Sequence, residues 1–413
     1  MKESISGKDL IIWNNLDKVT RQDSINIAKT RPIISKHPYK NLILLNAKDN
    51  YIKTVQNYRD SSWSSFKVKL EPQSSDILNI KGGWPTIHQH EQFYDYSYTD
   101  PLSKTNEGQI WVSFANKYLG GGYKCGGWVQ EEIITATFYE MALGIIEYEK
   151  KKLNLMNINE CFIWLNLLQC SKAVPITYGR LPRAPLADQP IGNFNVDDYI
   201  TLIDTPYMAD FISIDAPKRV NSTDPYSLQE LQHLFVKAFV GFRTCVLYDR
   251  SIIHTGNWGA GVFNNDVELI FIIQVLAAKL AGVTQIHFWG SKDRRQTKRI
   301  NTLMNDILIP SKLESCTFTD VFNTIKTLFK ITFSDRQVLE PILIQKWYWL
   351  NDHKQWIPYD DKMQSIISSQ LTDRNKIIKF SRGNYNYTIS YSLSEGWNQV
   401  NIDTKKQRSI TKM

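Results

Sequence analysis

Short apolar runs recur through the middle of the chain and predict the strands of a sheet. They occupy residues 110–114, 161–168, 211–214 and 284–289. Near-continuous apolar runs of this length are typical of strands that are covered on both faces. Since segments with helical spacing separate these runs, the pattern predicts an α/β domain with helices flanking a sheet.

The segment 131–148 has the length and the spacing of a helix. Ile134, Phe138, Met141 and Ile145 recur at intervals of three or four residues. Residues at that spacing share one face of a helix, where they form an apolar stripe that can pack on a sheet. We therefore expect one continuous helix over this segment.

Two further helices carry start signals. Ser227 and Glu230 have the spacing of a capping box, and the helix that follows is expected to run to about Phe242. Asp266 can cap another helix that extends through Ala281. Both helices stand between predicted strands, as an α/β layered domain requires.

The two ends of the chain differ from this middle region. Near the N-terminus only 11–13 and 42–45 are apolar, as short strand or buried-helix segments, and we interpret this stretch as an accessory layer. Beyond about residue 335 tryptophans cluster, a helix-like stretch covers 361–371, and two alternating strands follow. The sequence therefore predicts three parts: an N-terminal accessory region at 1–65, a main domain at 66–335 and a small α+β domain at 336–413.

The composition is that of an intracellular globular protein. Of the 413 residues, 42% are hydrophobic and 22% are charged, and residues 1–10 lack the apolar core of a signal peptide. The most apolar long stretch, 267–283, contains Glu268, Gln274 and Lys279, so no membrane association is expected. The five cysteines form no CxxC pair, which favours free thiols in a reducing compartment, the nucleus or the cytoplasm.

The formal net charge of +8 suits a polyanionic partner, although solubility explains it equally well. The chain has no block of like charges and no aromatic-flanked basic run, so direct DNA binding is not expected. No group of histidines and cysteines has the spacing of metal ligands, so we expect neither a metal nor a cofactor.

The most informative segment is 113–132, with the sequence SFANKYLGGGYKCGGWVQEE. It leaves a predicted strand, passes three consecutive glycines and enters a helix at Glu131 and Glu132. Glycines allow the backbone to approach a ligand closely enough for its amides to bind phosphate oxygens. The ordinary explanation is a flexible loop followed by acids that complement the helix dipole.

A second segment, 254–266, has the sequence HTGNWGAGVFNND and precedes the helix that Asp266 caps. Alternating glycines before a helix N-terminus are again suited to binding a diphosphate. The two segments together therefore predict two phosphate-binding turns in one domain.

The compound pattern of the first segment resembles the signature of the poly(ADP-ribose) glycohydrolase family. The pattern consists of the strand, Asn116, the triple glycine, seven intervening residues and Gln-Glu-Glu. The second segment is similar to the second phosphate loop of that family. Residues 214–216, 237–242 and 312–330 resemble the family in the same order, so the resemblance covers roughly 95–330. It implies a macrodomain-like mixed sheet flanked by helices.

The resemblance implies hydrolysis of the ribose–ribose O-glycosidic bonds of poly(ADP-ribose), with release of ADP-ribose. Glu132 corresponds to the general acid that protonates the departing ribose oxygen and then activates water. Glu131 corresponds to the residue that holds the ribose hydroxyls, and Asn116 to one near the scissile ribose. The other matching substrate-binding positions are Gly120, Gly121, Gly122, Gln130, Gly256, Asn257, Gly259, Gly261 and Phe263.

Within this resemblance, the backbone amides of residues 120–122 and 257–262 are expected to hold the diphosphate. Trp289 stands where the family carries an aromatic residue that packs on adenine. Tyr178 is a candidate for a second stacking residue, and an ordinary surface or core tyrosine is as good an explanation. The implied partners are poly(ADP-ribose) and poly(ADP-ribosyl)ated proteins.

Residues 347–360, with the sequence WYWLNDHKQWIPYD, resemble the opening of a WWE domain, and residues 387–391, 399–401 and 408–410 resemble its closing strands. Some WWE domains bind the internal unit of poly(ADP-ribose), and others do not. In those that bind it, aromatic side chains sandwich the base, while Gln and Arg hold ribose and phosphates. An aromatic core of a small β-rich domain is the alternative explanation for part of the pattern. The positions that match the polymer-binding residues are Trp349, Trp356, Tyr387, Gln399 and Arg408.

One position departs from the family. Ser113 stands where animal members carry an aspartate beside the ribose, which weakens the expected positioning of the substrate. Two other functions therefore stay open: a reader that binds ADP-ribose or its polymer without cleaving it, and a hydrolase of protein-linked mono-ADP-ribose.

Overall fold

The computed structural model describes two compact units, Met1–Val338 and Leu339–Met413. The described residues of the first unit are 10–70, 84–90, 108–174, 179–182, 192–220 and 226–289. Those of the second unit are 347–352, 356–360, 363, 367, 377–382, 385–392 and 396–412. Tyr178 and the segment 312–330 lie outside the described residues.

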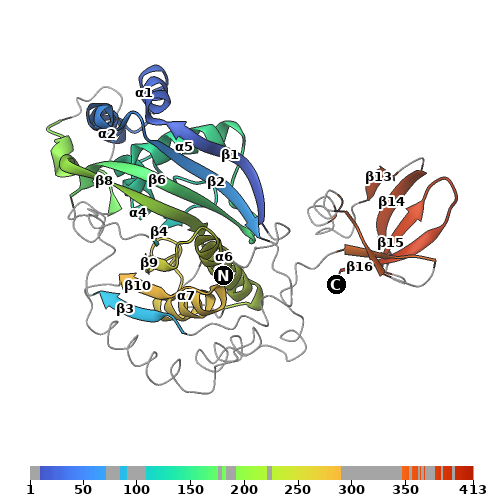
Figure 1. Cartoon of the computed structure of the whole chain (residues 1–413). Coiled ribbons are helices and arrows are strands. Elements are labelled where there is room, and N and C mark those ends of the chain that lie inside the picture. The colour runs from blue at the N-terminus through green and yellow to red at the C-terminus, as the bar shows by residue number, and fades with distance from the viewer. Residues whose placement is uncertain are drawn as a thin grey trace. The chain divides into compact units, whose positions relative to one another are not determined.

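An eight-stranded mixed sheet forms the centre of the first unit (Figure 1). Along this sheet, the first three pairs of neighbouring strands are antiparallel and the remaining four pairs are parallel. The carboxyl ends of these parallel strands therefore meet at one edge. In spatial order the strands are β1 (Leu10–Thr20), β2 (Ser62–Leu70), β6 (Glu160–Ala173), β8 (Ile200–Asp215), β4 (Gln109–Ala115), β9 (Ile252–Gly256), β10 (Gln285–Trp289) and β3 (Thr86–His90).

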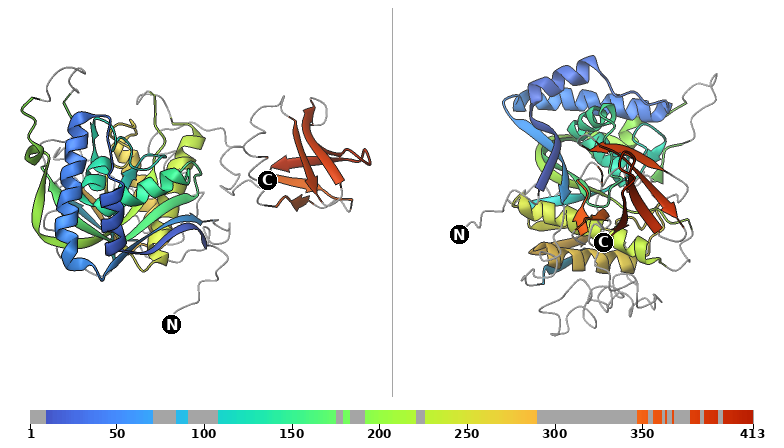
Figure 2. Two further views of the ribbon diagram at one scale, coloured as in Figure 1. Left: turned by 90° about the horizontal axis from the view of Figure 1, so that it is seen from above. Right: turned by 90° about the vertical axis from the view of Figure 1, so that its right-hand side faces the viewer.

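Helices cover both faces of this sheet. The helices α1 (Arg21–Thr30), α2 (Pro38–Val55), α4 (Gln130–Thr137) and α5 (Tyr139–Lys150) pack on one face. The helices α6 (Leu228–Leu247) and α7 (Val267–Ala281) lie on the opposite face, as the right-hand view of Figure 2 shows. Short elements complete the unit: the 3-10 helices η1 (Gln56–Tyr58) and η3 (Val196–Asp198), and the paired strands β5 (Gly127–Trp128) and β7 (Gly179–Arg180).

Most local predictions in this unit are confirmed. The four apolar runs of the middle region lie in β4, β6, β8 and β10. The capping box of Ser227 and Glu230 starts α6, and the Asp266 side chain accepts a bond from the Leu269 amide at the start of α7. The helix α6 continues to Leu247, beyond the predicted end at Phe242.

The prediction of one continuous helix over 131–148 is wrong, because the segment breaks into α4 and α5 at Phe138. The hydroxyls of Thr135 and Thr137 donate to the carbonyls of Glu131 and Ile133 at 2.7 and 2.9 Å. Side-chain bonds of this kind compete with the helical ladder and bend helices.

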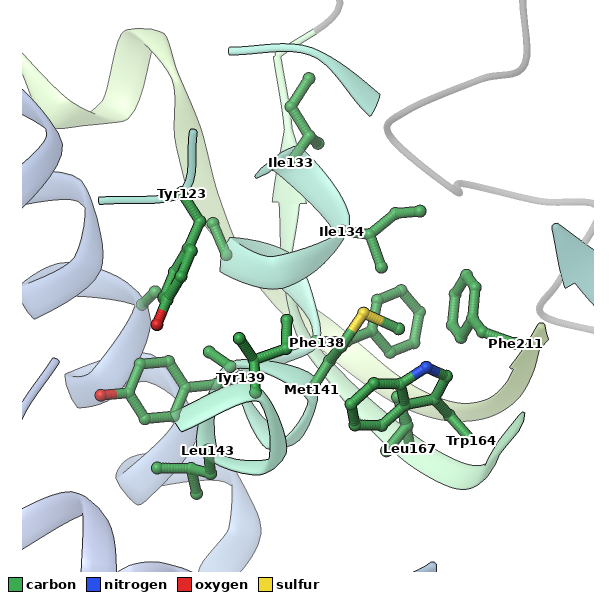
Figure 3. Packing of buried hydrophobic residues seen from close by; sticks show 14 of the residues in the cluster. Tyr123, Ile133, Ile134, Phe138, Tyr139, Met141, Leu143, Trp164, Leu167 and Phe211 are labelled. Atoms are coloured by element: carbon green, nitrogen blue, oxygen red, sulfur yellow. The ribbon is translucent and has the colours of Figure 1, made fainter. Parts of the chain in front are cut away.

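The break turns the Phe138 side chain into the core beneath the helices. Its ring packs edge-on against Phe211, with centroids 4.7 Å apart, and it is fully buried. Figure 3 shows Met141 and Trp164 beside these two rings. Packing of these large side chains against the sheet therefore outweighs the local tendency to continue the helix.

The N-terminal residues form part of the same sheet and core. The run 11–13 lies in β1, whereas the run 42–45 lies in α2. A buried ion pair joins α1 to α5, with Arg21 Nε 2.9 Å from Glu140 Oε1. Tyr51 of α2 donates to the same carboxylate at 3.0 Å. The region interpreted as an accessory layer thus shares strands and buried polar contacts with the rest of the unit.

The second unit contains a six-stranded antiparallel sheet. It has a small core of its own, which includes Trp347, Ile389 and Ile410. The predicted helix at 361–371 falls largely outside the described residues. In spatial order the strands are β12 (Trp356–Pro358), β11 (Trp347–Leu350), β16 (Gln407–Lys412), β15 (Gly396–Asn401), β14 (Tyr385–Ser392) and β13 (Ile378–Arg382).

Candidate active site

The two glycine segments meet at the carboxyl edge of the parallel strands. The first glycine loop, residues 116–129, follows β4, and the second glycine loop, residues 257–265, follows β9. These strands are neighbours in the sheet, and β8 lies on the other side of β4. Ligands in open α/β sheets bind outside the carboxyl ends of the strands, so this edge is the candidate site.

Glu131 stands in the first turn of α4 with its carboxylate turned back toward the first glycine loop. Its Oε2 accepts a hydrogen bond from the Asn116 amide at 2.8 Å, and its Oε1 accepts one from the Gly120 amide at 2.5 Å. The side chain is buried. Burial raises the pKa of Glu131 well above its usual range, the two amide bonds oppose the shift, and the charges of Glu132 and Asp215 add to it.

Glu132 is held by the other half of the same loop. Its Oε1 accepts from the Gly122 amide at 2.7 Å, and its Oε2 accepts from the Val129 amide at 2.6 Å. This side chain is buried as well. Two consecutive glutamates are therefore fixed by different pairs of backbone amides.

The glycines of the loop are required by the closeness of these carboxylates. A Cβ on Gly121, whose φ is +50°, would lie 2.7 Å from Glu131 Oε2. A Cβ on Gly122 or on Gly127 would lie 2.7 Å from Glu132 Oε1. Distances below about 3 Å do not occur between unbonded atoms of these kinds, so larger residues would displace the carboxylates.

The structure shows what two amides of the first loop bind. The amides of Gly120 and Gly122 donate to the two glutamates, where the resemblance implied that they hold the diphosphate. The physical reason is that a buried carboxylate needs hydrogen-bond donors, and the adjacent loop supplies them. The glycines thus build the acid pair.

Gln130, which the resemblance placed among the substrate-binding residues, bonds to the backbone of β4. Its Oε1 accepts from the Phe114 amide at 2.8 Å, and its Nε2 donates to the Val112 carbonyl at 2.9 Å. Both ends of its amide group join the start of α4 to the strand. Gln130 therefore sets the position of the helix that carries the two glutamates.

The second glycine loop is tightly built. A Cβ on Gly256 would collide with the Trp289 carbonyl of β10, and a Cβ on Gly259, at φ +70°, would lie 2.5 Å from Ala216. The Asn265 Nδ2 donates to the Gly259 carbonyl at 2.9 Å. Among the positions proposed for substrate, Gly261 is exposed, while Asn257 and Phe263 are partly buried.

Trp289 lies at the end of β10 and is buried. Its ring stacks on His90 with centroids 3.8 Å apart, and its Nε1 donates to His254 Nδ1 at 3.2 Å. Burial, together with His287 and two other imidazoles nearby, lowers the pKa of His254 to about 2, so that ring is neutral and can accept this bond. One face of the Trp289 ring is thus covered by His90, which the sequence had not linked to it.

Residues 87–298 match the family model described as poly(ADP-ribose) glycohydrolase, macro domain fold. The chain belongs to the poly(ADP-ribose) glycohydrolase family. Residues 345–412 match the model of the WWE domain. The resemblance that the glycine loops and the paired glutamates suggested is therefore confirmed.

Individual proteins of the glycohydrolase family resemble this chain to different extents. Poly(ADP-ribose) glycohydrolase 1 of Caenorhabditis elegans is 31% identical over 185 residues, which are 43% of this chain and 22% of that protein. The chain thus spans about a fifth of the length of this relative. A Deinococcus radiodurans poly(ADP-ribose) glycohydrolase in complex with ADP-ribose is 15% identical, covering 57% of this chain and 89% of its own, with a TM-score of 0.38. The Thermomonospora curvata poly(ADP-ribose) glycohydrolase is 14% identical, covering 73% and 97%, with a TM-score of 0.38.

Ser113, where this chain departs from the animal members of the glycohydrolase family, is fully buried. It lies in β4 opposite Ser213 of β8. Its hydroxyl has no hydrogen-bond partner among the described residues. The Ser113 hydroxyl is therefore buried within the layers of the first unit.

One residue at the candidate site was not found by the sequence analysis. Lys40 of α2 is fully buried and donates to the Gly127 carbonyl of the first glycine loop at 2.6 Å. A lone lysine in an N-terminal helix carries no local signal of such a role.

In the WWE unit, Arg408 lies over Trp349, with the guanidinium carbon 5.0 Å from the ring centroid. Arg408 Nη2 also pairs with Asp352 at 3.1 Å, and Lys406 Nζ pairs with that carboxylate at 2.6 Å. Hydrogen bonds from Lys406 and Arg408 lower the pKa of Asp352. The arginine expected to hold phosphate thus already has an anionic partner.

The other WWE positions are distributed over the same sheet. Gln399 is buried and accepts a bond from the Tyr359 hydroxyl at 2.5 Å. The ring of Tyr387 stacks on Phe380 with centroids 5.2 Å apart. Trp356 lies in β12, and its side chain is outside the described residues.

The described residues also bear on metal binding and on membrane insertion. Among them, no group of three or more His, Cys, Asp or Glu side chains could hold a metal ion. Their helices include none with the length and apolar character needed to cross a membrane.

Proposed function

We propose that this chain hydrolyses the ribose–ribose O-glycosidic bonds of poly(ADP-ribose) and releases ADP-ribose. The observation that carries the proposal is the pair of adjacent buried carboxyls, Glu131 and Glu132, each held by two loop amides at the carboxyl edge of the sheet. Glycoside hydrolysis needs a carboxyl group that donates and accepts a proton at a fixed place. The match of residues 87–298 to the glycohydrolase family supports this chemistry.

In the proposed reaction, Glu132 in its acid form gives its proton to the ribose oxygen that leaves. The bond between this oxygen and the anomeric carbon breaks, and the positive charge develops on the remaining sugar. The carboxylate of Glu132 then takes a proton from water, whose oxygen bonds to the anomeric carbon. Glu132 is thereby regenerated as an acid, so no cofactor is needed. We assign to Glu131 the task of holding the ribose hydroxyls.

We place the diphosphate at the second glycine loop, because the first loop uses the amides of Gly120 and Gly122 for the glutamates. The start of α7 follows this loop, and a helix N-terminus favours an anion. Adenine would then lie near Trp289, whose ring must exchange its contact with His90 for one with the base. This arrangement is our proposal for the orientation of the substrate.

The WWE unit, in our proposal, binds a second stretch of the same polymer. A second contact raises the local concentration of substrate at the catalytic unit without changing the chemistry. The proposed partners are poly(ADP-ribose) and proteins that carry it, and the proposed location is the nucleus, the cytoplasm or both.

Glu132→Gln tests the hydrolysis. The amide cannot give up a proton as an acid, so release of ADP-ribose from labelled poly(ADP-ribose) should fall on the order of 10²–10⁴-fold, measured by chromatography of the products. Glu147→Gln is the matched control, because Glu147 pairs with Lys150 on the surface of α5 and should leave the rate unchanged. Full activity of Glu132→Gln would show that another group is the acid.

The same assay separates the two other functions. A reader would bind the polymer without releasing ADP-ribose even as the unaltered chain. A mono-ADP-ribosyl hydrolase would release the protein-linked unit and leave the ribose–ribose bonds of the polymer intact. The reader function is worth testing because the buried Ser113 stands where animal members of the family carry an aspartate.

A further inference from the structure

Lys40 lies beside the proposed acid, although it comes from a part of the chain far away in sequence. Its side chain is fully buried, and its Nζ donates to the Gly127 carbonyl at 2.6 Å. The ammonium also lies 4.4 Å from the centroid of the Trp128 ring. A buried ammonium is costly unless it is bonded, so these contacts fix the position of both partners.

The bond to Gly127 acts on the part of the loop that encloses Glu132. A Cβ on Gly127 would lie 2.7 Å from Glu132 Oε1 and 2.9 Å from Oε2, so the space between the Gly127 backbone and the carboxylate is too small for a side chain. Two residues further on, the Val129 amide donates to Oε2 at 2.6 Å. A shift of the Gly127 peptide would therefore move the loop backbone that surrounds the Glu132 carboxylate.

Neighbours of Lys40 attach the same stretch of loop to the start of α2. The Ser35 hydroxyl donates to the Lys124 carbonyl at 2.7 Å. The His37 ring, which caps α2, lies against Gly126, where a Cβ would be 2.9 Å from Nε2. On its other side the loop is paired with β7 through β5. The residues before α2 and the first turn of α2 thus pack against one side of the loop that holds Glu132.

The charge on Lys40 depends on pH within a measurable range. Burial lowers the pKa of Lys40 to about 8, and the charges of Glu132 and Cys125 oppose the shift. The charged groups that act on it are thus Glu132 from α4 and Cys125 from the loop. Burial and the charge of Lys40 in turn lower the pKa of His37, the N-cap residue of α2. The ammonium is therefore present at neutral pH and is lost as the pH rises through about 8.

We infer that Lys40 is a positioning residue for Glu132, which acts by holding the Gly127 carbonyl with a charged donor. This inference rests on the proposed hydrolysis. It gives the N-terminal helix α2 a part in the activity, because the lysine of this helix sets the position of the loop backbone around Glu132. A charge-assisted hydrogen bond is roughly twice as strong as a neutral one, so the neutral amine should hold the peptide less firmly.

Lys40→Met in the full chain tests the inference by removing the donor while keeping a side chain of similar length. We expect kcat on poly(ADP-ribose) to fall on the order of 10²-fold, as misplacement of a catalytic group by about 1 Å can cause, with little change in KM. Lys279→Met is the matched control, because Lys279 is also a buried lysine over a tryptophan, Trp84, but lies in the last turn of α7. The control should keep the parental kcat.

The pH profile distinguishes this role from a merely structural one. The parental activity should decline by several-fold as the pH rises through about 8, where Lys40 loses its proton. Lys40→Arg keeps a charge at all these pH values, so its profile should lack that decline even if its overall rate is lower. If Lys40→Met proves unstable in thermal unfolding, the comparison of the parent with Lys40→Arg decides alone.

The two proposals fail in different ways. An unaltered kcat in folded Lys40→Met, or an identical alkaline decline in the parent and Lys40→Arg, would overturn the role of Lys40 while hydrolysis stands. A parental chain that releases no ADP-ribose from the polymer would overturn the proposed function itself.

Discussion

One loop bonds to two neighbouring glutamates through different backbone amides. Glu131 is bonded to the amides at the start of the loop, those of Asn116 and Gly120, and Glu132 to those further along. The chemistry of the side chains is identical, so the separate roles that we propose for them must come from these contacts. Because the loop backbone touches the carboxylates, glycine is needed at the points of contact.

Gly121→Ala should therefore cost more than backbone strain alone. Its φ of +50° makes an alanine strained by about 1–2 kcal/mol, and the new Cβ would also lie 2.7 Å from Glu131 Oε2. We expect the rate of ADP-ribose release to fall on the order of 10²-fold. Gly192→Ala is the matched control, since Gly192 has a φ of +68° and a Cβ added there would meet nothing within 4 Å. Equal effects of the two substitutions on activity would refute this role of Gly121.

At the scale of elements, buried polar contacts join the N-terminal helices to the helices that follow the acid pair. Arg21 of α1 pairs with Glu140 of α5, and its Nη2 donates to the Asn166 carbonyl at 2.5 Å. Glu140 also accepts from the Leu168 amide at 2.8 Å. The pair thereby connects α1, α5 and β6 in one network.

Arg21→Met should destabilise the first unit strongly. It leaves Glu140 buried without its cation, which typically costs about 3–5 kcal/mol. Arg31→Met is the comparison, because Arg31 is 66% exposed in its side chain and lies 3.8 Å from Glu147. An exposed pair of this kind contributes about 1 kcal/mol or less. Urea unfolding of both variants measures the difference, and similar free energies of unfolding would contradict the argument.

The whole molecule divides into two units that are each compact. The WWE unit has its own sheet and core, so the polymer binding that we propose for it can be studied separately from the proposed hydrolysis. Its candidate phosphate ligand, Arg408, is paired with Asp352. A phosphate that approaches Arg408 must compete with this carboxylate, which the sequence pattern alone does not reveal.

Residues 339–413 alone should therefore bind poly(ADP-ribose), with an affinity that Asp352 limits. Arg408→Ala should abolish detectable binding in a filter or calorimetric assay, and Asp352→Asn should tighten it several-fold by freeing the guanidinium for phosphate. Lys405→Ala removes an exposed positive charge from the neighbouring turn and serves as the control. Undiminished binding by Arg408→Ala would take that arginine out of the site.

The sequence by itself located those elements whose signals are local. The apolar runs of β4, β6, β8 and β10 and the caps of α6 and α7 depend on residues within a few positions of one another, so a linear pattern contains them. The prediction of one continuous helix over 131–148 also used only local signals, and for that reason it was wrong. Phe138 leaves the helix to fill a space against Phe211, and that space exists only once the sheet is assembled.

In the candidate site, too, some features follow from local sequence and others depend on the assembled fold. A contiguous segment contains the glycines, Glu131 and Glu132, so the sequence determined which residues form the acid pair and its loop. Tertiary structure decided what the loop amides bind, where the Gln130 amide points, and that Lys40 reaches Gly127 across 87 positions of sequence. The physical reason is that buried polar groups must find partners wherever the fold brings donors and acceptors together.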